Sequence, residues 1–142
     1  MRVYSACMRI LLLLAIAFLG GLLATAFSGG FSADSMYYVD IARHVASGDG
    51  VTSAILAQHD LFVDPKPVTV WPPLYPVAIA GLAQFGIEAA VAARLVPLLS
   101  LGALAVLFWR LGAVTFAPSV GFIAALLLIV WPRTMRVATV AW

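Results

Sequence analysis

The chain has 142 residues, of which 64% are hydrophobic and only 10% are charged, and its formal net charge is +2. A soluble domain carries roughly 25% charged residues, so this chain has too little polar surface to cover a globule in water. Its eight Lys and Arg residues form no basic stripe, so nucleic acid is not an expected partner. The single Cys7 excludes an intrachain disulfide. Composition therefore predicts an apolar surface that faces lipid.

Residues 9–28 form the first predicted transmembrane helix, whose apolar run starts at Ile10. At about 1.5 Å per residue the run covers about 28 Å, close to the thickness of the hydrocarbon core. Arg2 and Arg9 precede it and no acidic residue does, so the positive-inside rule places the N-terminus in the cytoplasm. A cleaved signal peptide is the alternative, because the basic start and the small residues near Ala24 also fit one. The length of the run favours an uncleaved signal anchor.

The segment 29–90 is predicted to be a loop on the extracytoplasmic side. Five of the six acidic residues and both histidines lie in its first part, between positions 29 and 73. Residues 34–47 predict an amphipathic helix on the bilayer surface, with Ser32 or Asp34 as its cap and Gly48 after its end. Its apolar face carries four residues at helical spacing, namely Tyr38, Ile41, Ala42 and Val45.

Two more transmembrane helices are predicted after the loop, over residues 91–109 and 116–131. Before them, residues 76–87 are apolar but cover only about 18 Å, which predicts an interfacial helix and not a span. With this count Arg110 falls on the cytoplasmic side together with the N-terminal arginines, as the charge bias requires. The predicted fold class is therefore an all-α membrane protein with about three spans and an outer loop that carries amphipathic or interfacial helices.

No phosphate-binding glycine loop, dinucleotide fingerprint or Cys/His metal pattern is present. Asp34 is the main catalytic candidate, because a carboxylate at the membrane surface is partly desolvated and more basic, and could accept a proton from an acceptor hydroxyl or amine. The alternative is a plain helix N-cap, a position that Asp favours. Asp40 could hold a divalent cation together with Asp34 only if the backbone bends, because residues six apart do not share a helix face. Asp40 is therefore interpreted as a solvated surface acid.

Other residues of the loop are candidates for binding a phosphate or a sugar. Arg43 and His44 could meet a phosphate, although a lipid head group is the favoured partner. Lys66 lies between prolines in a stiff segment and is a phosphate candidate, with a solvent-exposed lysine as the alternative. In the string Trp71-Pro72-Pro73-Leu74-Tyr75-Pro76, the rings could anchor the chain at the interface or stack on a sugar.

The order of these features resembles the C-type glycosyltransferase superfamily, and within it the bacterial relatives of dolichyl-phosphate-mannose protein mannosyltransferases. The resemblance covers nearly the whole chain and rests, after the first span, on Asp34-Ser35-Met36-Tyr37-Tyr38, Ala46-Ser47-Gly48-Asp49-Gly50, the proline-rich string at 71–76, Ala92-Ala93-Arg94-Leu95 and the final span from Gly121 to Pro132. Such enzymes are several times longer, and no polar tail follows Met135. We therefore expect the chain to be an N-terminal piece of a longer enzyme.

The resemblance implies a multi-pass plasma-membrane enzyme that transfers a sugar from a polyprenyl-phosphate donor on the extracytoplasmic face. It assigns Asp34 as the acid that positions or deprotonates the acceptor, Tyr38 as a recurring aromatic residue, and the proline-rich string as part of the donor site. Lys66, Arg133 and Arg136 could stabilise the departing lipid phosphate. The expected partners are the lipid donor and membrane lipids. No cofactor is assigned, a divalent cation stays an open alternative, and the acceptor is not specified.

Two positions depart from the pattern of these relatives. Ser35 stands where many of them carry a second acid, and Trp71 where some have Lys. The competing hypothesis is a small non-catalytic membrane subunit or scaffold that binds a partner through its outer loop. A transport module is the third hypothesis, and it is disfavoured because the predicted spans are nearly free of polar residues.

Overall fold

The computed structural model describes residues 2–27, 33–55, 66–68 and 72–139, and the chain is mostly helical (81%). Its elements are α1 (Arg2–Phe27), α2 (Ala33–Ser47), β1 (Thr52–Ser53), β2 (Lys66–Pro67), α3 (Leu74–Ala83), α4 (Ala89–Thr115), α5 (Pro118–Val130) and α6 (Pro132–Thr139). They form two compact units. The bundle unit comprises Met1–Gly29 and Pro97–Val140, and the loop unit is built from Gly30–Val96.

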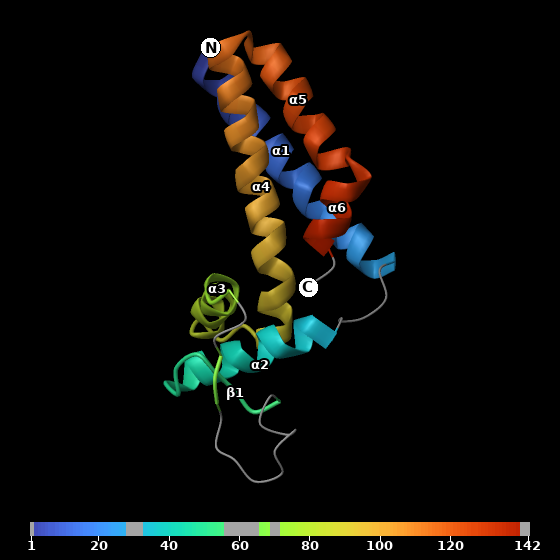
Figure 1. Ribbon diagram of the computed structural model, residues 1–142. Coiled ribbons are helices and arrows are strands. Elements are labelled where there is room, and N and C mark those ends of the chain that lie inside the picture. Colours follow the sequence, from blue (N-terminus) through green and yellow to red (C-terminus); the bar gives the residue numbers. More distant parts are fainter. Residues whose placement is uncertain (1, 28–32, 56–65, 69–71, 140–142) are drawn as a thin grey trace. The chain divides into compact units, whose positions relative to one another are not determined.

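The bundle unit contains α1, the part of α4 from Pro97 onward, α5 and α6. Its core is formed by buried apolar residues from α1, α4 and α5, namely Leu13, Ala17, Leu101, Ala105, Trp109, Ala125 and Ile129. Helix α1 begins at the end of the bundle where α4 turns into α5 (Figure 1). The topology that places the N-terminal arginines and Arg110 on one side of the membrane stays a prediction.

Close helix packing in the bundle unit depends on two glycines. A Cβ atom built on Gly112 would lie 2.6 Å from the Cα of Gly121, and one built on Gly121 would lie 2.3 Å from the carbonyl oxygen of Trp109. Both distances are shorter than any real contact of a Cβ atom, so α4 and α5 approach each other through their backbones. Pro118 starts α5, where its missing N–H leaves no helical hydrogen bond unmade.

Among the residues that the structure describes, two helices are long and apolar enough to cross a membrane, by length and composition. They are the α1 segment Ala6–Thr25, with 20 residues, and α4, with 27 residues. Both overlap predicted spans, 9–28 and 91–109. Large apolar side chains are exposed along the bundle unit, including Leu11, Leu19, Leu23, Leu107, Leu111 and Leu127.

The third predicted span, 116–131, corresponds to α5, which has 13 residues. Such a helix is about 20 Å long, whereas the hydrocarbon core is about 30 Å thick. It ends because Trp131 has an extended backbone with ψ 121°, as is favoured before a proline. Pro132 then starts the short helix α6, which the sequence analysis did not predict. The third span therefore stays a prediction.

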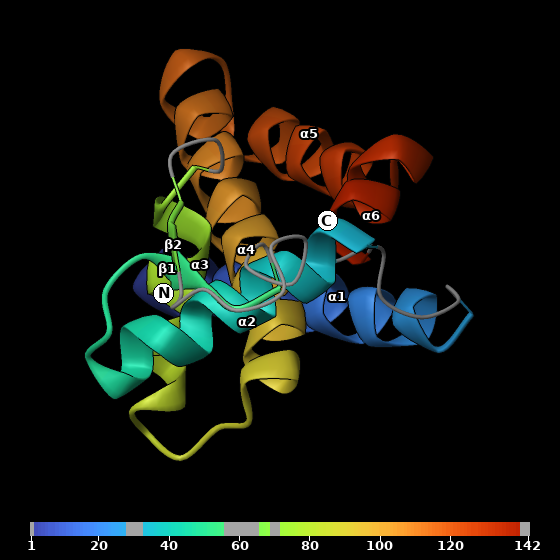
Figure 2. The same cartoon turned by 60° about the horizontal axis from the view of Figure 1, so that its bottom comes forward.

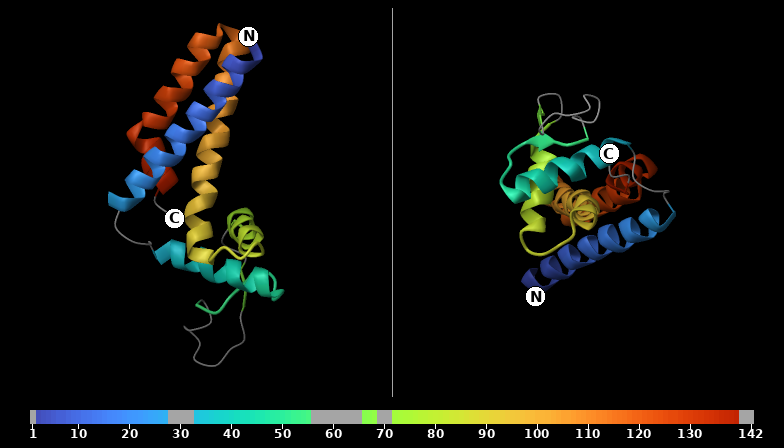
Figure 3. Two further views of the ribbon diagram at one scale, coloured as in Figure 1. Left: turned by 180° about the vertical axis from the view of Figure 1, so that it is seen from behind. Right: turned by 90° about the horizontal axis from the view of Figure 1, so that it is seen from below.

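The loop unit consists of α2, α3, the first turns of α4 and the paired strands β1 and β2. Helix α2 lies beside α3 and across the start of α4 (Figure 3). Buried apolar residues of the three helices form one core, namely Val39, Ala42, Ile79, Ala80, Ala89, Ala92 and Ala93. The two strands lie side by side (Figure 2) and pair antiparallel, Thr52 with Pro67 and Ser53 with Lys66.

Local signals explain where the loop-unit helices begin and end. Helix α2 was predicted at 34–47 and ends in a Schellman motif, in which Gly48 has φ 93° and the Asp49 N–H donates to the His44 carbonyl. Helix α3 was predicted at 76–87 but begins two residues earlier. It can include Pro76 because the first four N–H groups of a helix have no helical partner. It ends four residues earlier, before a turn closed by Gly86 at φ 82°.

Candidate functional site

Asp34 lies in the first turn of α2 with its side chain exposed. Its predicted desolvation depends on the membrane surface and stays a prediction. Tyr38 follows one turn later and is half-buried in the loop-unit core. Its pKa is raised by burial and, to a smaller extent, by the negative charge of Asp34. Asp34 and Tyr38 thus form one electrostatic pair at the start of α2.

Tyr75 from α3 joins this pair to the start of α4. Its ring packs edge-on against Tyr38, with ring centroids 4.9 Å apart and an interplanar angle of 75°. Its hydroxyl donates a hydrogen bond of 2.6 Å to the carbonyl oxygen of Ala93. Burial, and then the neighbouring Tyr38, raise the pKa of Tyr75 to about 12. Tyr75, whose ring was predicted to stack on a sugar or to anchor the chain at the interface, therefore packs within the loop unit.

Ser35, the position where relatives carry a second acid, is almost fully buried. A carboxylate at this position would be desolvated, which is costly without a partner. In this fold the residue after Asp34 points into the loop unit, and it could not share a surface site with Asp34.

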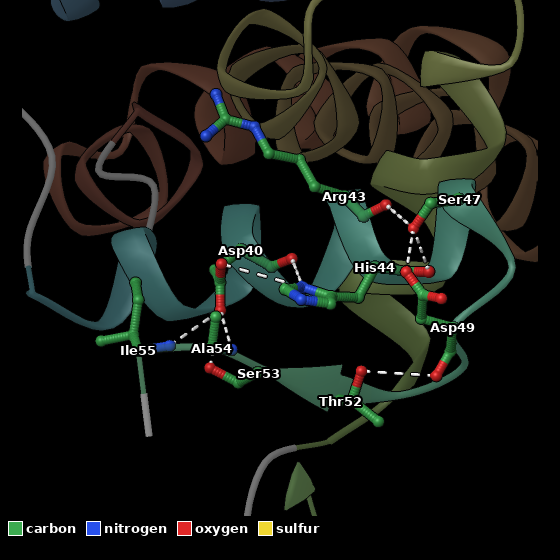
Figure 4. Close-up of polar contacts among 9 residues, drawn as sticks. All are labelled: Asp40, Arg43, His44, Ser47, Asp49, Thr52, Ser53, Ala54 and Ile55. Carbon is green, nitrogen blue, oxygen red and sulfur yellow. Dashed lines mark hydrogen bonds and ion pairs between the residues drawn. The ribbon is translucent and has the colours of Figure 1, made fainter. Parts of the chain in front are cut away.

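Asp40 is not the solvated acid that the sequence analysis predicted. Its side chain is only 18% exposed, and its Oδ2 atom accepts hydrogen bonds from Ser53 Oγ at 2.7 Å, Ala54 N at 2.9 Å and Ile55 N at 3.3 Å. Figure 4 shows the carboxylate turned toward these three residues. Asp40 thereby binds the chain that follows β1 to the side of α2. These bonds could not be predicted, because no local sequence pattern indicates which acid will meet a distant backbone.

His44 and Arg43, both predicted to meet a phosphate, have partners within the loop unit. The Nδ1 atom of His44 lies 2.9 Å from the carbonyl oxygen of Asp40 and 3.8 Å from its Oδ1 atom. The Arg43 guanidinium donates to Glu88 Oε1 at 3.0 Å, and both of these side chains are largely exposed. These contacts fix His44 against Asp40 on α2 and join Arg43 to Glu88 at the start of α4. Of the two side chains, only the Arg43 guanidinium is largely exposed.

Glu88 has a role that the sequence analysis did not assign, as the cap of α4. Its Oε2 atom accepts a hydrogen bond from the N–H of Val91 at 3.1 Å. The pKa of Glu88 is held below its usual value, first by a hydrogen bond from the N–H of Ala90 and then by those from Arg43 and Val91. A negative charge at the start of a helix is favoured by the helix dipole, which is the signal that could have predicted this role.

The remaining predicted site residues are dispersed. Pro72 and Pro73 are exposed, and Pro73 caps the start of α3. Arg133 is exposed on α6 in the bundle unit. Trp71 lies outside the described residues, as do the side chains of Lys66 and Arg136. Of the predicted residues, the structure brings together Asp34, Tyr38 and Tyr75.

Within the described ranges, no three His, Cys, Asp or Glu residues gather in a way that could hold a metal ion. A scan against protein-family models and searches of curated proteins and of solved structures found no match for this chain.

Proposed function

We propose that the chain is an integral membrane protein and part of a glycosyltransferase. The enzyme would transfer a sugar from a polyprenyl-phosphate donor to an acceptor on the extracytoplasmic face. The observation that carries the proposal is the placement of Asp34, an exposed carboxylate in the first turn of a helix that follows an apolar helix of spanning length. The lipid tail of such a donor stays in the bilayer, so the reacting phosphate is at the interface. A carboxylate at the same depth can accept the proton of an acceptor hydroxyl or amine.

Features of each unit, taken separately, support this role. The loop unit has a packed core, and Tyr38 and Tyr75 hold the first turns of α2 on its surface. Exposed apolar side chains along α1 and α4 suit a lipid environment. Arg43 and Arg133 are exposed cationic residues of the kind that would bind a lipid phosphate.

The test is sugar transfer by the complete gene product in membranes, with Asp34→Asn against Asp49→Asn. Asp49 is also an exposed acid of the loop unit, but it follows the end of α2. We expect Asp34→Asn to lower kcat by about 10²-fold or more, because general base catalysis contributes about 10²–10⁴-fold, and Asp49→Asn to retain transfer. Transfer at the wild-type rate by Asp34→Asn removes Asp34 from the mechanism. An absence of transfer by the wild-type protein favours a non-catalytic subunit instead.

A further inference from the structure

Helix α4 contains a proline whose missing hydrogen bond is supplied from another helix. Pro97 lies inside α4 and has no N–H. In an α-helix the N–H of residue 97 would donate to the carbonyl of residue 93. The side chain and backbone of Ala93 are buried, and the Tyr75 hydroxyl donates to its carbonyl oxygen at 2.6 Å. Tyr75 therefore provides the donor that Pro97 removes, and a buried carbonyl left without one would be destabilising.

The ring of the same residue faces α2. It meets Tyr38 edge-on at 4.9 Å, and Tyr38 is one turn from Asp34 on the same helix. The two rings pack against the loop-unit core together with Val39 and Ala42. The Tyr75 ring therefore helps to fix the position and rotation of the first turns of α2. The ring is itself held by the hydrogen bond from its hydroxyl to the Ala93 carbonyl on α4.

We propose that Tyr75 is a positioning residue whose hydroxyl completes α4 at the carbonyl opposite Pro97 and whose ring holds Tyr38, and through it the turn of α2 that carries Asp34. The hydroxyl half of this inference stands on the hydrogen bond and the proline alone. The second half rests on the proposed function, because it assigns a catalytic consequence to the position of Asp34.

The hydroxyl half is tested by NMR of the chain in detergent micelles or nanodiscs, with ¹³C-carbonyl alanine and ¹⁵N arginine. The sequence has only two Ala-Arg pairs, Ala42-Arg43 and Ala93-Arg94, so two carbonyl–amide cross-peaks are expected. Tyr75→Phe should move the Ala93 carbonyl upfield, as loss of its hydrogen bond requires, and leave the Ala42 peak in place. An unmoved Ala93 peak overturns this half.

A second variant guards against a general loss of structure. Pro97→Ala returns an N–H opposite the Ala93 carbonyl, so the Tyr75→Phe/Pro97→Ala double variant should bring the Ala93 peak back toward its original position. Tyr75→Phe alone should lower the folded-to-unfolded equilibrium constant by about tenfold, the usual effect of leaving a buried carbonyl unpaired. In the Pro97→Ala background the same change should have less than a third of that effect. Equal effects in both backgrounds contradict the pairing of Tyr75 with Pro97.

The positioning half is tested by sugar transfer with the complete gene product. Tyr75→Leu removes the ring contact to Tyr38, and a misplaced Asp34 should lower kcat by roughly tenfold to a hundredfold with the KM for the lipid donor unchanged. A raised donor KM with unchanged kcat instead shows that Tyr75 stacks on the sugar, and it overturns the positioning role. If Asp34→Asn leaves transfer intact, the proposed function fails and the positioning half fails with it, while the NMR result still decides the hydroxyl half.

Discussion

The side chain of Asp40 holds a separate segment of the chain against α2 through three hydrogen bonds. It accepts hydrogen bonds from the hydroxyl of Ser53 at the end of β1 and from the two backbone N–H groups that follow. Ser53, one of the donors, is fully buried. A carboxylate is suited to this position because it accepts several hydrogen bonds at once and strengthens each by its charge. A neutral side chain of similar shape would satisfy fewer of these donors.

Replacing Asp40 should therefore release the chain after β1. We expect Asp40→Ala to lower the free energy of unfolding by about 2 kcal/mol, because hydrogen bonds to charged groups contribute about 1.5–3 kcal/mol. It should also remove hydrogen-exchange protection from the amides of Ala54 and Ile55. Asp49→Ala is the control, since Asp49 is exposed and its side chain accepts a hydrogen bond from Ser47 close by in the chain. Retained protection at both amides in Asp40→Ala would show that the carboxylate does not hold this segment.

Glycines inside two of the helices, α3 and α5, differ in their surroundings. Gly81 lies inside α3 with no atom within 4 Å of a Cβ position, whereas Gly121 in α5 faces the backbone of α4. A glycine in a helix interior is unfavourable by roughly 0.5–1 kcal/mol relative to alanine. The glycine in α5 is explained by backbone contact, and the one in α3 has no packing reason among the described residues.

This contrast gives a prediction with a built-in control. Gly121→Ala should destabilise the bundle unit by about 1–3 kcal/mol or more, because the added methyl group must push α4 and α5 apart. Gly81→Ala should be neutral or stabilise the chain by up to about 1 kcal/mol. Unfolding of both variants in a detergent series measures the difference. Equal stabilities for the two variants would contradict the close approach of α4 and α5.

At the scale of the whole molecule, the two helices of spanning length determine what topology the chain can have. The proposed orientation places the N-terminus in the cytoplasm, α2 outside and the turn between α4 and α5 inside. This orientation predicts Asp49 outside and Ser119 inside, and both side chains are exposed within their own units. Cys7 is the single cysteine of the sequence, so after its replacement an introduced cysteine is the one thiol of this sequence that can react.

Cysteine labelling tests this topology in intact cells that produce the complete gene product. In a Cys7→Ser background, we expect the Asp49→Cys variant to react with an impermeant thiol reagent added outside. The Ser119→Cys variant should react only after the membrane is permeabilised. The reverse pattern rejects the orientation, and labelling of both variants without permeabilisation rejects α4 as a transmembrane helix.

Much of the helical content was predictable because it depends on local residue patterns. Leucine- and alanine-rich runs favour helix and predicted α1 and α4, and Gly48 marked the end of α2. Pro132 could have predicted the break between α5 and α6, since the residue before a proline avoids the helical conformation. The fold class was predicted in its coarser form, as a mostly helical chain with apolar helices of spanning length.

The candidate site was predictable only in part. Short-range spacing was enough to predict that Asp34 lies in the first turn of a helix after an apolar run, and that Tyr38 lies one turn further on. The contacts of Tyr75 with Tyr38 and the Ala93 carbonyl, and of Asp40 with Ser53, exist only in the folded chain. These contacts join residues 13 to 37 positions apart in the chain. No local pattern encodes them, because the packing of α2 on α3 and α4 brings these groups within bonding distance.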